Sequence, residues 1–231
     1  MQNLNDFNTR KELDVALAAK VASELKKAIA EKGKASMAVS GGSTPKGFFA
    51  ALSLIDLAWS KVTITLADER WVEFDNDASN TRLVHENLLQ NKAKLATFFH
   101  IKKGELLSEQ TLSELNKQAK EDLLPLDVLI LGMGEDGHTA SLFPCSDQIE
   151  QGLSLDNSNA LMKVVPKTAP NDRITFTFAH LIQSKNIILH VCGESKKVVL
   201  AKANAGTDFF EMPVRAFLQN QTVTTQIYWA E

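Results

Sequence analysis

Cysteine is scarce in this chain of 231 residues, and the two that occur stand alone. Cys145 and Cys192 are far apart in the sequence, and neither has companions at the spacing of a metal site. We therefore expect neither a disulfide framework nor a metal cluster. The polar N-terminus, residues 1–9, lacks a signal-peptide pattern, so the sequence favours a reducing, cytoplasmic location.

Long apolar runs and an excess of positive charge are also missing. No apolar stretch approaches the length that spans a membrane. The formal net charge is -3, which gives no basic surface for nucleic acid. We therefore expect no membrane and no nucleic-acid partner, and an anionic ligand would have to be attracted by local positive charge.

Strand-like and helix-like segments alternate along the chain. This order favours an α/β fold with a parallel or mostly parallel sheet that is covered on both faces. The length allows one large domain or two small ones. Strands are expected over 35–40, 62–67, 128–131, 161–165, 173–178 (half-buried), 186–192 and 224–229. Helices are expected over 11–31, 45–54, 79–89, 109–123, 179–184, 194–203 and 213–218.

The most informative segment is a glycine-rich loop, 132–144, that follows the apolar strand 128–131. Glu135, Asp136 and His138 lie in this loop among three glycines. In open α/β sheets, ligands bind at loops after the carboxyl ends of strands. A histidine there, beside a carboxylate, is suited to proton transfer near neutral pH. The alternative is a tight strand–helix turn whose histidine is merely on the surface.

A second motif, Ser40-Gly-Gly-Ser-Thr-Pro45, links a short strand to a helix. Gly41 and Gly42 let the backbone approach a ligand, and the hydroxyls of Ser43 and Thr44 with the first helical N–H groups could bind an anion. Either hydroxyl residue could cap the helix, with Pro45 at its first position. The spacing is neither a Walker loop nor a dinucleotide motif, and it suits a phosphate monoester. The alternative is an ordinary capped helix start.

Charged residues stand at three further strand or helix ends. Asp68 and Arg70 follow the strand 62–67, Arg173 precedes the strand 173–178, and Lys196 opens a helix. An arginine offers a planar fork for phosphate or carboxylate. Each of these charges taken alone is more often a solvated surface group. The other histidines are weaker candidates because none has a glycine-rich loop: His85, His100, His180 and His190.

These motifs together resemble the glucosamine-6-phosphate isomerase/6-phosphogluconolactonase family, and within it the lactonases. The resemblance implies one Rossmann-like α/β domain over 1–231. It also implies a hydrolase that converts 6-phospho-D-glucono-1,5-lactone to 6-phospho-D-gluconate in the oxidative pentose phosphate pathway, without metal or organic cofactor. The partner would be a small sugar phosphate, and the protein a monomer or small homo-oligomer. The matching segments are 40–45, 68–72, 79–80, 132–144, 173–175 and 193–196.

For such a reaction we hypothesise a role for each candidate residue, and the phosphate ligands among them are implied by the resemblance. His138 would act as general base on a water, and Asp136 would orient its imidazole. Phosphate would be bound by Ser43, Arg173 and Lys196. Backbone N–H groups of the 132–144 loop, or Arg70, would hold the oxyanion. Asp68 would bind sugar hydroxyls or assist the proton transfers.

Two other functions are considered. An amino-sugar-phosphate deaminase or isomerase of the same fold has a glutamate where this chain has Phe143, which cannot carry a proton. A non-catalytic sugar-phosphate sensor would normally need a helix-turn-helix, and 34 residues before the first expected strand leave room for one long helix only. The loops around 72–79 and 144–160, rich in Asp, Asn and Ser, are either surface excursions near a site or disordered.

Overall fold

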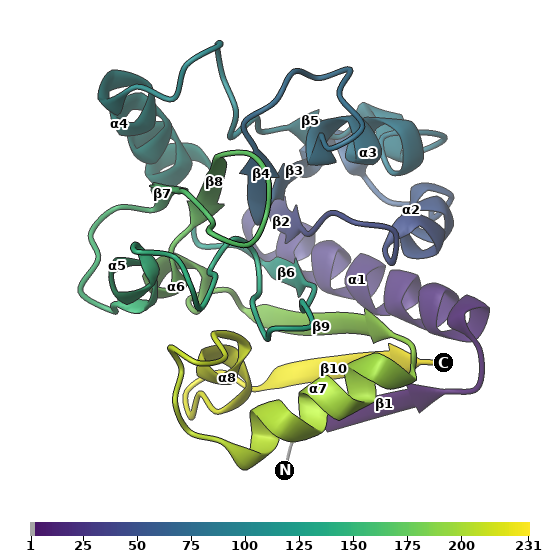
Figure 1. Ribbon diagram of the computed structural model, residues 1–231. Helices are drawn as coiled ribbons and strands as arrows, with labels where there is room; N and C mark the ends of the chain where they lie inside the picture. The colour runs from purple at the N-terminus through teal and green to yellow at the C-terminus, as the bar shows by residue number, and fades with distance from the viewer. Residues whose placement is uncertain (1–2) are drawn as a thin grey trace.

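The computed structural model describes residues 3–231, and Figure 1 shows strands and helices alternating along most of the chain. The strands are β1 (Asn3–Phe7), β2 (Ala35–Val39), β3 (Val62–Leu66), β4 (Asp68–Arg70), β5 (Thr97–Phe98), β6 (Val128–Leu131), β7 (Leu161–Val164), β8 (Arg173–Phe176), β9 (Asn186–Cys192) and β10 (Thr225–Ala230). The helices are α1 (Arg10–Lys32), α2 (Lys46–Ser53), α3 (Asn80–Asn87), α4 (Glu109–Gln118), α5 (Ile149–Leu153), α6 (Phe178–Leu181), α7 (Glu194–Ala205) and α8 (Val214–Leu218). Three short helical turns cover Trp59–Lys61, Ala93–Leu95 and Ala119–Leu123.

The main sheet has the order β1-β10-β9-β6-β2-β3-β5, and neighbouring strands pair in parallel. The expected mostly parallel α/β sheet is thus confirmed. From β2 the chain continues to β3 and β5 on one side, whereas β6 is followed by β9 and β10 on the other. The edge between β2 and β6 is therefore a topological switch point, where open α/β sheets bind ligands beyond the carboxyl ends of their strands.

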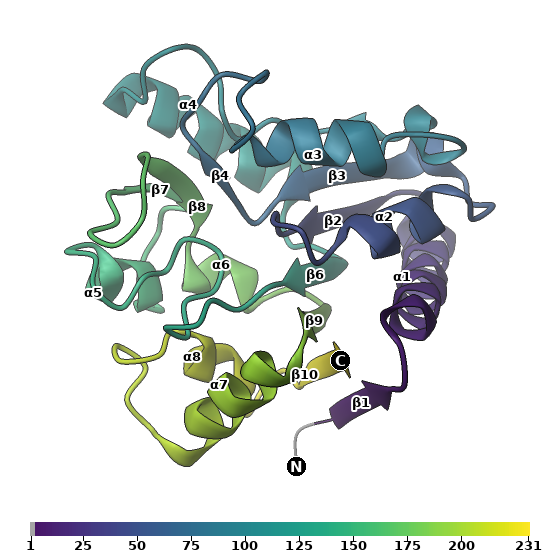
Figure 2. The ribbon, with the colours of Figure 1, turned by 45° about the vertical axis from the view of Figure 1, so that its right-hand side comes forward.

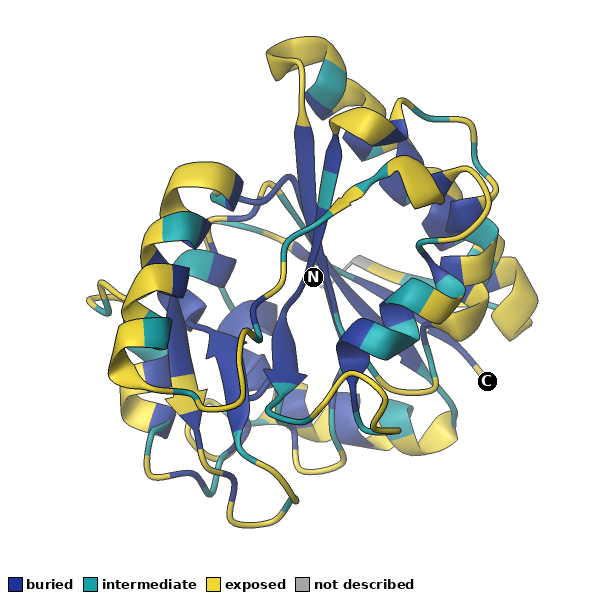
Figure 3. Ribbon diagram, turned by 90° about the horizontal axis from the view of Figure 1, so that it is seen from above, coloured by how far each residue is buried: buried dark blue, intermediate teal, exposed yellow. Residues whose placement is uncertain are grey.

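Helices cover both faces of this sheet. Figure 2 shows α1 on one side of β9 and β10, with α7 and α8 on the other. Figure 3 shows buried strands inside a shell of helices whose outer faces are exposed. In α1, side chains spaced by about four residues are fully buried, as its sequence predicted, and Gly33 ends the helix at φ 78°. Within residues 3–231, no helix is long and apolar enough to cross a membrane.

The first strand was not expected from the sequence. β1 pairs in parallel with β10 at the edge of the sheet, with Leu4 opposite Ile227. Its sequence is polar because the strand is exposed along its free edge, so it lacks the apolar run that identifies a buried strand. The expectation that the first strand begins at residue 35 is therefore wrong, whereas the single long helix expected before it is present as α1. Met1 and Gln2 lie outside the described residues.

A second sheet, antiparallel in the order β4-β8-β7, stands beside the carboxyl end of β3. Ala67, between β3 and β4, joins it to the main sheet: its carbonyl accepts from the N–H of Phe176 at 3.0 Å, and its N–H donates to the carbonyl of Val39 on β2 at 2.9 Å. All four residues of β8 are buried, so the expectation that this strand is only half-buried is wrong. Its threonine face is covered because Thr175 packs beneath the loop after β6, where its hydroxyl accepts from the N–H of Ser141.

The start of α2 also differs from the expectation. Pro45 immediately precedes the helix, and neither Ser43 nor Thr44 caps it. The carboxylate of Asp14, on α1, instead accepts a hydrogen bond from the backbone N–H of Phe48. The capping role is therefore filled from another helix, and the two hydroxyls face the pocket described below.

Candidate active site

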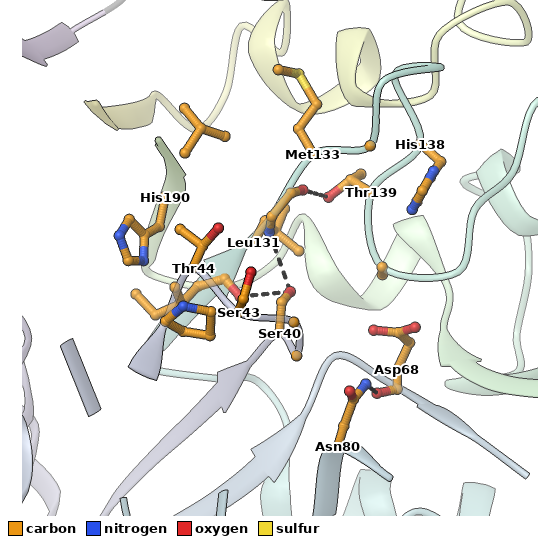
Figure 4. Close-up of a pocket in the computed structure, with 18 of the residues that line it drawn as sticks. Ser40, Ser43, Thr44, Asp68, Asn80, Leu131, Met133, His138, Thr139 and His190 are labelled. Atoms are coloured by element: carbon orange, nitrogen blue, oxygen red, sulfur yellow. Dashed lines mark hydrogen bonds between the residues drawn. The ribbon is translucent and has the colours of Figure 1, made fainter. Parts of the chain in front are cut away.

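One cavity of about 490 Å³ lies at the switch point, where loops after β2, β6 and β9 meet the β4–β8 sheet. Figure 4 shows Ser43, Thr44, Asp68 and His138 arranged around it. Nine of the ten residues predicted for the site line this cavity: Gly41, Gly42, Ser43, Thr44, Asp68, Arg70, His138, Arg173 and Lys196. The tenth, Asp136, lies directly behind His138. The structure therefore brings the predicted residues together around one cavity. That this cavity is the active site, and the role of each residue, stay predictions.

The loop after β6 folds back on itself to present His138. The N–H of Gly134 donates to the carbonyl of His138 at 2.9 Å, and Gly137 adopts a φ of 78°, which favours glycine. A side chain at position 134 would collide with the imidazole ring. The N–H of Val214, at the start of α8, donates to the carbonyl of Gly137 at 2.9 Å and anchors the loop from outside.

His138 is oriented by Asp136. Its Nδ1 lies 2.6 Å from Oδ1 of Asp136, and the same carboxylate oxygen accepts from the backbone N–H of His138 at 3.1 Å. A carboxylate is an acceptor only, so Nδ1 carries the proton and Nε2 of the neutral ring has a free lone pair. Burial raises the pKa of Asp136, but the hydrogen bonds from the ring and backbone of His138, and the attraction of the carboxylate to a protonated imidazole, outweigh burial and hold that pKa below its usual range. The pair is arranged as a general base with its orienting acid.

Asp68 is buried in the wall of the cavity, 7% exposed. Its Oδ2 accepts from the hydroxyl of Ser141 at 2.5 Å, and its backbone carbonyl accepts from the side chain of Asn80 at 3.1 Å. Asn80 also packs against Gly41, where any side chain would collide with the amide. This contact joins the β4 strand to the turn after β2, and it requires glycine at position 41.

Glu69 links the end of β4 to the start of α3 from inside the protein. It is 1% exposed and accepts hydrogen bonds from the backbone N–H groups of Arg70, Asn80 and Thr81, at 2.7, 2.9 and 2.6 Å. The Thr81 hydroxyl adds a fourth at 2.7 Å. Burial raises the pKa of Glu69, and these hydrogen bonds oppose that rise. Glu69 thus fixes the start of α3 to β4 and orients two residues of the cavity.

The turn after β2 is tied to the loop after β6 by Ser40. Its hydroxyl donates to the carbonyl of Ile130 at 3.1 Å and accepts from the N–H of Gly132 at 3.2 Å. Gly42 in the turn has a φ of 94°, which favours glycine. The turn is therefore rigidly placed at the switch point, with Ser43 and Thr44 on the cavity wall.

Lys196, in the first turn of α7, completes the cationic lining. Its Nζ lies 2.7 Å from Oε1 of Glu135, a residue of the same loop that carries Asp136 and His138. The lysine side chain is 19% exposed and the glutamate 65% exposed. A candidate anion-binding lysine and the loop of the candidate base are thus in direct contact.

Four residues that the sequence did not assign to the site also line or support it: Asn80, Ser141, Phe143 and His190. Asn80, Ser141 and Phe143 lie in segments that match the family, but their contacts in the site are tertiary, so the sequence did not indicate them. His190 on β9 is 3% exposed and packs edge-on against the ring of Phe48 at 5.9 Å. Its Nε2 lies 4.0 Å from Oδ1 of Asp14, too far for a hydrogen bond. Burial lowers the pKa of His190 to about 4, so it is neutral at pH 7.

Within the described residues, no group of three or more His, Cys, Asp or Glu side chains is arranged to hold a metal ion. Both cysteines, Cys145 and Cys192, are free thiols.

An open parallel α/β sheet with a cationic, histidine-bearing pocket at its switch point defines a class of proteins that bind small anionic ligands. Comparison with known sequences identifies the group within that class. The chain belongs to the family of glucosamine-6-phosphate isomerases/6-phosphogluconolactonase, whose sequence model matches residues 8–229. The family resemblance drawn from the motifs is therefore confirmed.

Individual relatives agree with this assignment. The chain is 44% identical over 228 residues to a 6-phosphogluconolactonase of Rhizobium meliloti, covering 99% of this chain and 98% of that protein. It is 41% identical over 228 residues to one of Mesorhizobium japonicum, covering 99% and 95%. The crystal structure of a 6-phosphogluconolactonase from Shewanella baltica superimposes with a TM-score of 0.96 at 41% identity, covering 100% of this chain and 98% of that one.

Proposed function

We propose that this protein hydrolyses 6-phospho-D-glucono-1,5-lactone to 6-phospho-D-gluconate, with His138 as general base. The observation that carries the proposal is the Asp136–His138 pair at 2.6 Å, placed on a cavity that also contains two arginines and a lysine. The full-length similarity to 6-phosphogluconolactonases supports the choice of substrate.

In the proposed reaction, Nε2 of His138 takes a proton from a water as its oxygen attacks the lactone carbonyl carbon. The resulting tetrahedral oxyanion is stabilised by the guanidinium of Arg70 or by backbone N–H groups of the 132–144 loop. The bond from that carbon to the ring oxygen then breaks, and the ring oxygen receives the proton from His138. The product is the open-chain acid, which ionises to the carboxylate.

Asp136 keeps the imidazole in the required tautomer and stabilises its charged form in the intermediate. Asp68 has one carboxylate oxygen engaged by Ser141 and a second that can accept from a sugar hydroxyl. Ser43, Arg173 and Lys196 bind the phosphate, so that binding energy far from the carbonyl orients the lactone.

The same proposal treats residues 1–231 as a single catalytic unit that acts in the cytoplasm, as a monomer or small homo-oligomer and without a cofactor. Phe143, the ring in contact with His138, offers no second proton carrier of the kind that an amino-sugar-phosphate deaminase would use.

The test is substrate discrimination by the purified protein. Freshly prepared 6-phosphogluconolactone is supplied and 6-phosphogluconate is measured through 6-phosphogluconate dehydrogenase; unphosphorylated gluconolactone and glucosamine 6-phosphate are supplied in parallel. We expect fast turnover of the phosphorylated lactone, slow turnover of gluconolactone and no ammonia from the amino sugar. Hydrolysis no faster than the spontaneous rate, or release of ammonia, would refute the proposal.

A further inference from the structure

Phe143 lies against both the candidate base, His138, and a candidate phosphate ligand, Arg173. Its ring centroid lies 4.3 Å from that of the His138 imidazole, with 35° between the planes. The Cζ atom of Arg173 lies over the same ring, 5.9 Å from its centroid. The phenylalanine lines the cavity and is 4% exposed. One aromatic ring is therefore shared by the candidate base and a candidate phosphate ligand.

The ring is itself held in place by a different part of the fold. It packs in a small apolar cluster with Met162 and Val164 of β7, flanked by Cys145 and Ala169. Its backbone carbonyl accepts from both the N–H and the hydroxyl of Ser146 at 3.1 Å. The cluster lies apart from the main core, so the packing that fixes this ring belongs to the β7–β8 hairpin.

A second restraint on His138 has a clear physical purpose. The hydrogen bond to Asp136 holds one edge of the imidazole, but a ring held at one atom can still rotate about that contact. A neighbouring aromatic ring restricts this rotation, because aromatic pairs have preferred geometries. The Phe143 ring also attracts the guanidinium of Arg173 electrostatically.

We propose that Phe143 is a positioning residue that fixes the imidazole of His138 relative to the guanidinium of Arg173. It touches neither the proton in transit nor the breaking bond; it keeps the base and the phosphate ligand at the spacing that one lactone molecule demands. The inference rests on the proposed function, and it adds a residue that links base and phosphate site through a single side chain.

The experiment compares Phe143→Leu with Phe143→Tyr. Leucine keeps an apolar side chain but removes the ring face, whereas tyrosine keeps the ring. We expect Phe143→Leu to lower kcat on the order of 10- to 100-fold, the effect of a small misplacement of a catalytic group, and to weaken binding of inorganic phosphate. Phe143→Tyr should restore both toward the wild-type values.

Phe178→Leu is the matched control. Phe178 is similarly buried, 5% exposed, and packs edge-on against Phe217 at 4.9 Å, outside the lining of the cavity. It should lose stability without losing kcat at temperatures where it remains folded. Wild-type kcat in Phe143→Leu, or an equal loss of kcat in Phe178→Leu, would overturn the inference.

The nitrogen NMR signals of the His138 ring provide a second readout, which does not need turnover. In the wild-type protein they should report one neutral tautomer with the proton on Nδ1, and in Phe143→Leu an average of conformers. Should Phe143→Leu fail to fold, Phe143→Met is measured in the same way. Unchanged ring signals in a folded variant without the ring would contradict the inference. Absence of lactonase turnover in the wild type would instead refute the proposed function.

Discussion

Arg70 and Arg173 stand directly opposite each other in the antiparallel ladder of β4 and β8, and both line the cavity. Each has an Nε atom that is buried without a hydrogen-bond partner among the described residues. Burial, together with the charge of Arg70, lowers the pKa of Arg173. Like charges at directly opposed strand positions destabilise a sheet. The two guanidinium groups therefore repel each other, and we expect an anion bound between them to reduce that repulsion.

Anions should accordingly stabilise the folded protein. Inorganic phosphate at about 100 times its Kd is expected to raise the free energy of unfolding by about 2.7 kcal/mol, measured as a higher Tm than in chloride of equal ionic strength. Arg173→Ala should lose most of this rise and weaken substrate binding more than kcat. Lys61→Ala, an exposed lysine away from the cavity, serves as control. A full phosphate response in Arg173→Ala would show that this arginine does not bind the anion.

Glu135→Gln should strengthen phosphate binding. Glu135 forms a 2.7 Å ion pair with Lys196, and a substrate phosphate that binds Lys196 must compete with this carboxylate. The pair is partly exposed and worth about 1 kcal/mol or less, so the gain in affinity is at most about fivefold. Glu194→Gln, whose carboxylate pairs with Lys197 instead, corrects for the general loss of negative charge. The affinity for inorganic phosphate is measured by titration calorimetry. Weaker binding in Glu135→Gln would contradict the idea that Glu135 competes with phosphate for Lys196.

Glu69→Gln should damage both stability and activity. The amide has one acceptor oxygen where the carboxylate has two, and its NH₂ group would face backbone donors at the start of α3. Leaving buried donors unsatisfied costs about 1–3 kcal/mol, measurable by urea denaturation. Because Glu69 also orients Arg70 and Asn80, kcat/KM should fall at temperatures where the variant is folded. Unchanged kcat/KM would mean that Arg70 and Asn80 keep their positions without the carboxylate.

His190 should make the protein sensitive to acid. Its pKa is about 4 in the folded protein against 6.5 for an ordinary histidine, so the unfolded chain binds more protons between these values. The contribution of His190 to the free energy of unfolding is then fully present above pH 6.5. It falls by about 1.4 kcal/mol per pH unit as the pH drops toward 4. Burial raises the pKa of the nearby Asp14, so Asp14 acts in the opposite sense: its contribution to stability grows as the pH falls. His190→Leu should flatten the pH dependence of the free energy of unfolding, measured by urea denaturation between pH 5 and 6.5. An unchanged slope would mean that other groups cause the pH dependence.

The sequence predicted those parts of the structure that depend on local pattern. The apolar run before Gly132 marks β6, and the glycines after it mark a loop that brings Asp136 and His138 together. The polar edge strand β1 was missed because it has no apolar pattern; backbone pairing with β10, which the sequence does not reveal, forms the strand. The contacts of Ser141 with Asp68 and of Phe143 with Arg173 join residues 73 and 30 positions apart. Such contacts depend on how the β4–β8 sheet packs against the loop after β6, which no short segment specifies.

The most direct test of the account is the kcat of His138→Ala with 6-phosphogluconolactone, corrected for spontaneous hydrolysis. His180→Ala, a histidine on α6 outside the cavity lining, serves as control. Loss of a general base should lower kcat by about 10²- to 10⁴-fold. The affinity for 6-phosphogluconate should change little, since the proposed phosphate ligands remain, and His180→Ala should keep the wild-type rate. A His138→Ala variant that hydrolyses the lactone at the wild-type rate would contradict the account.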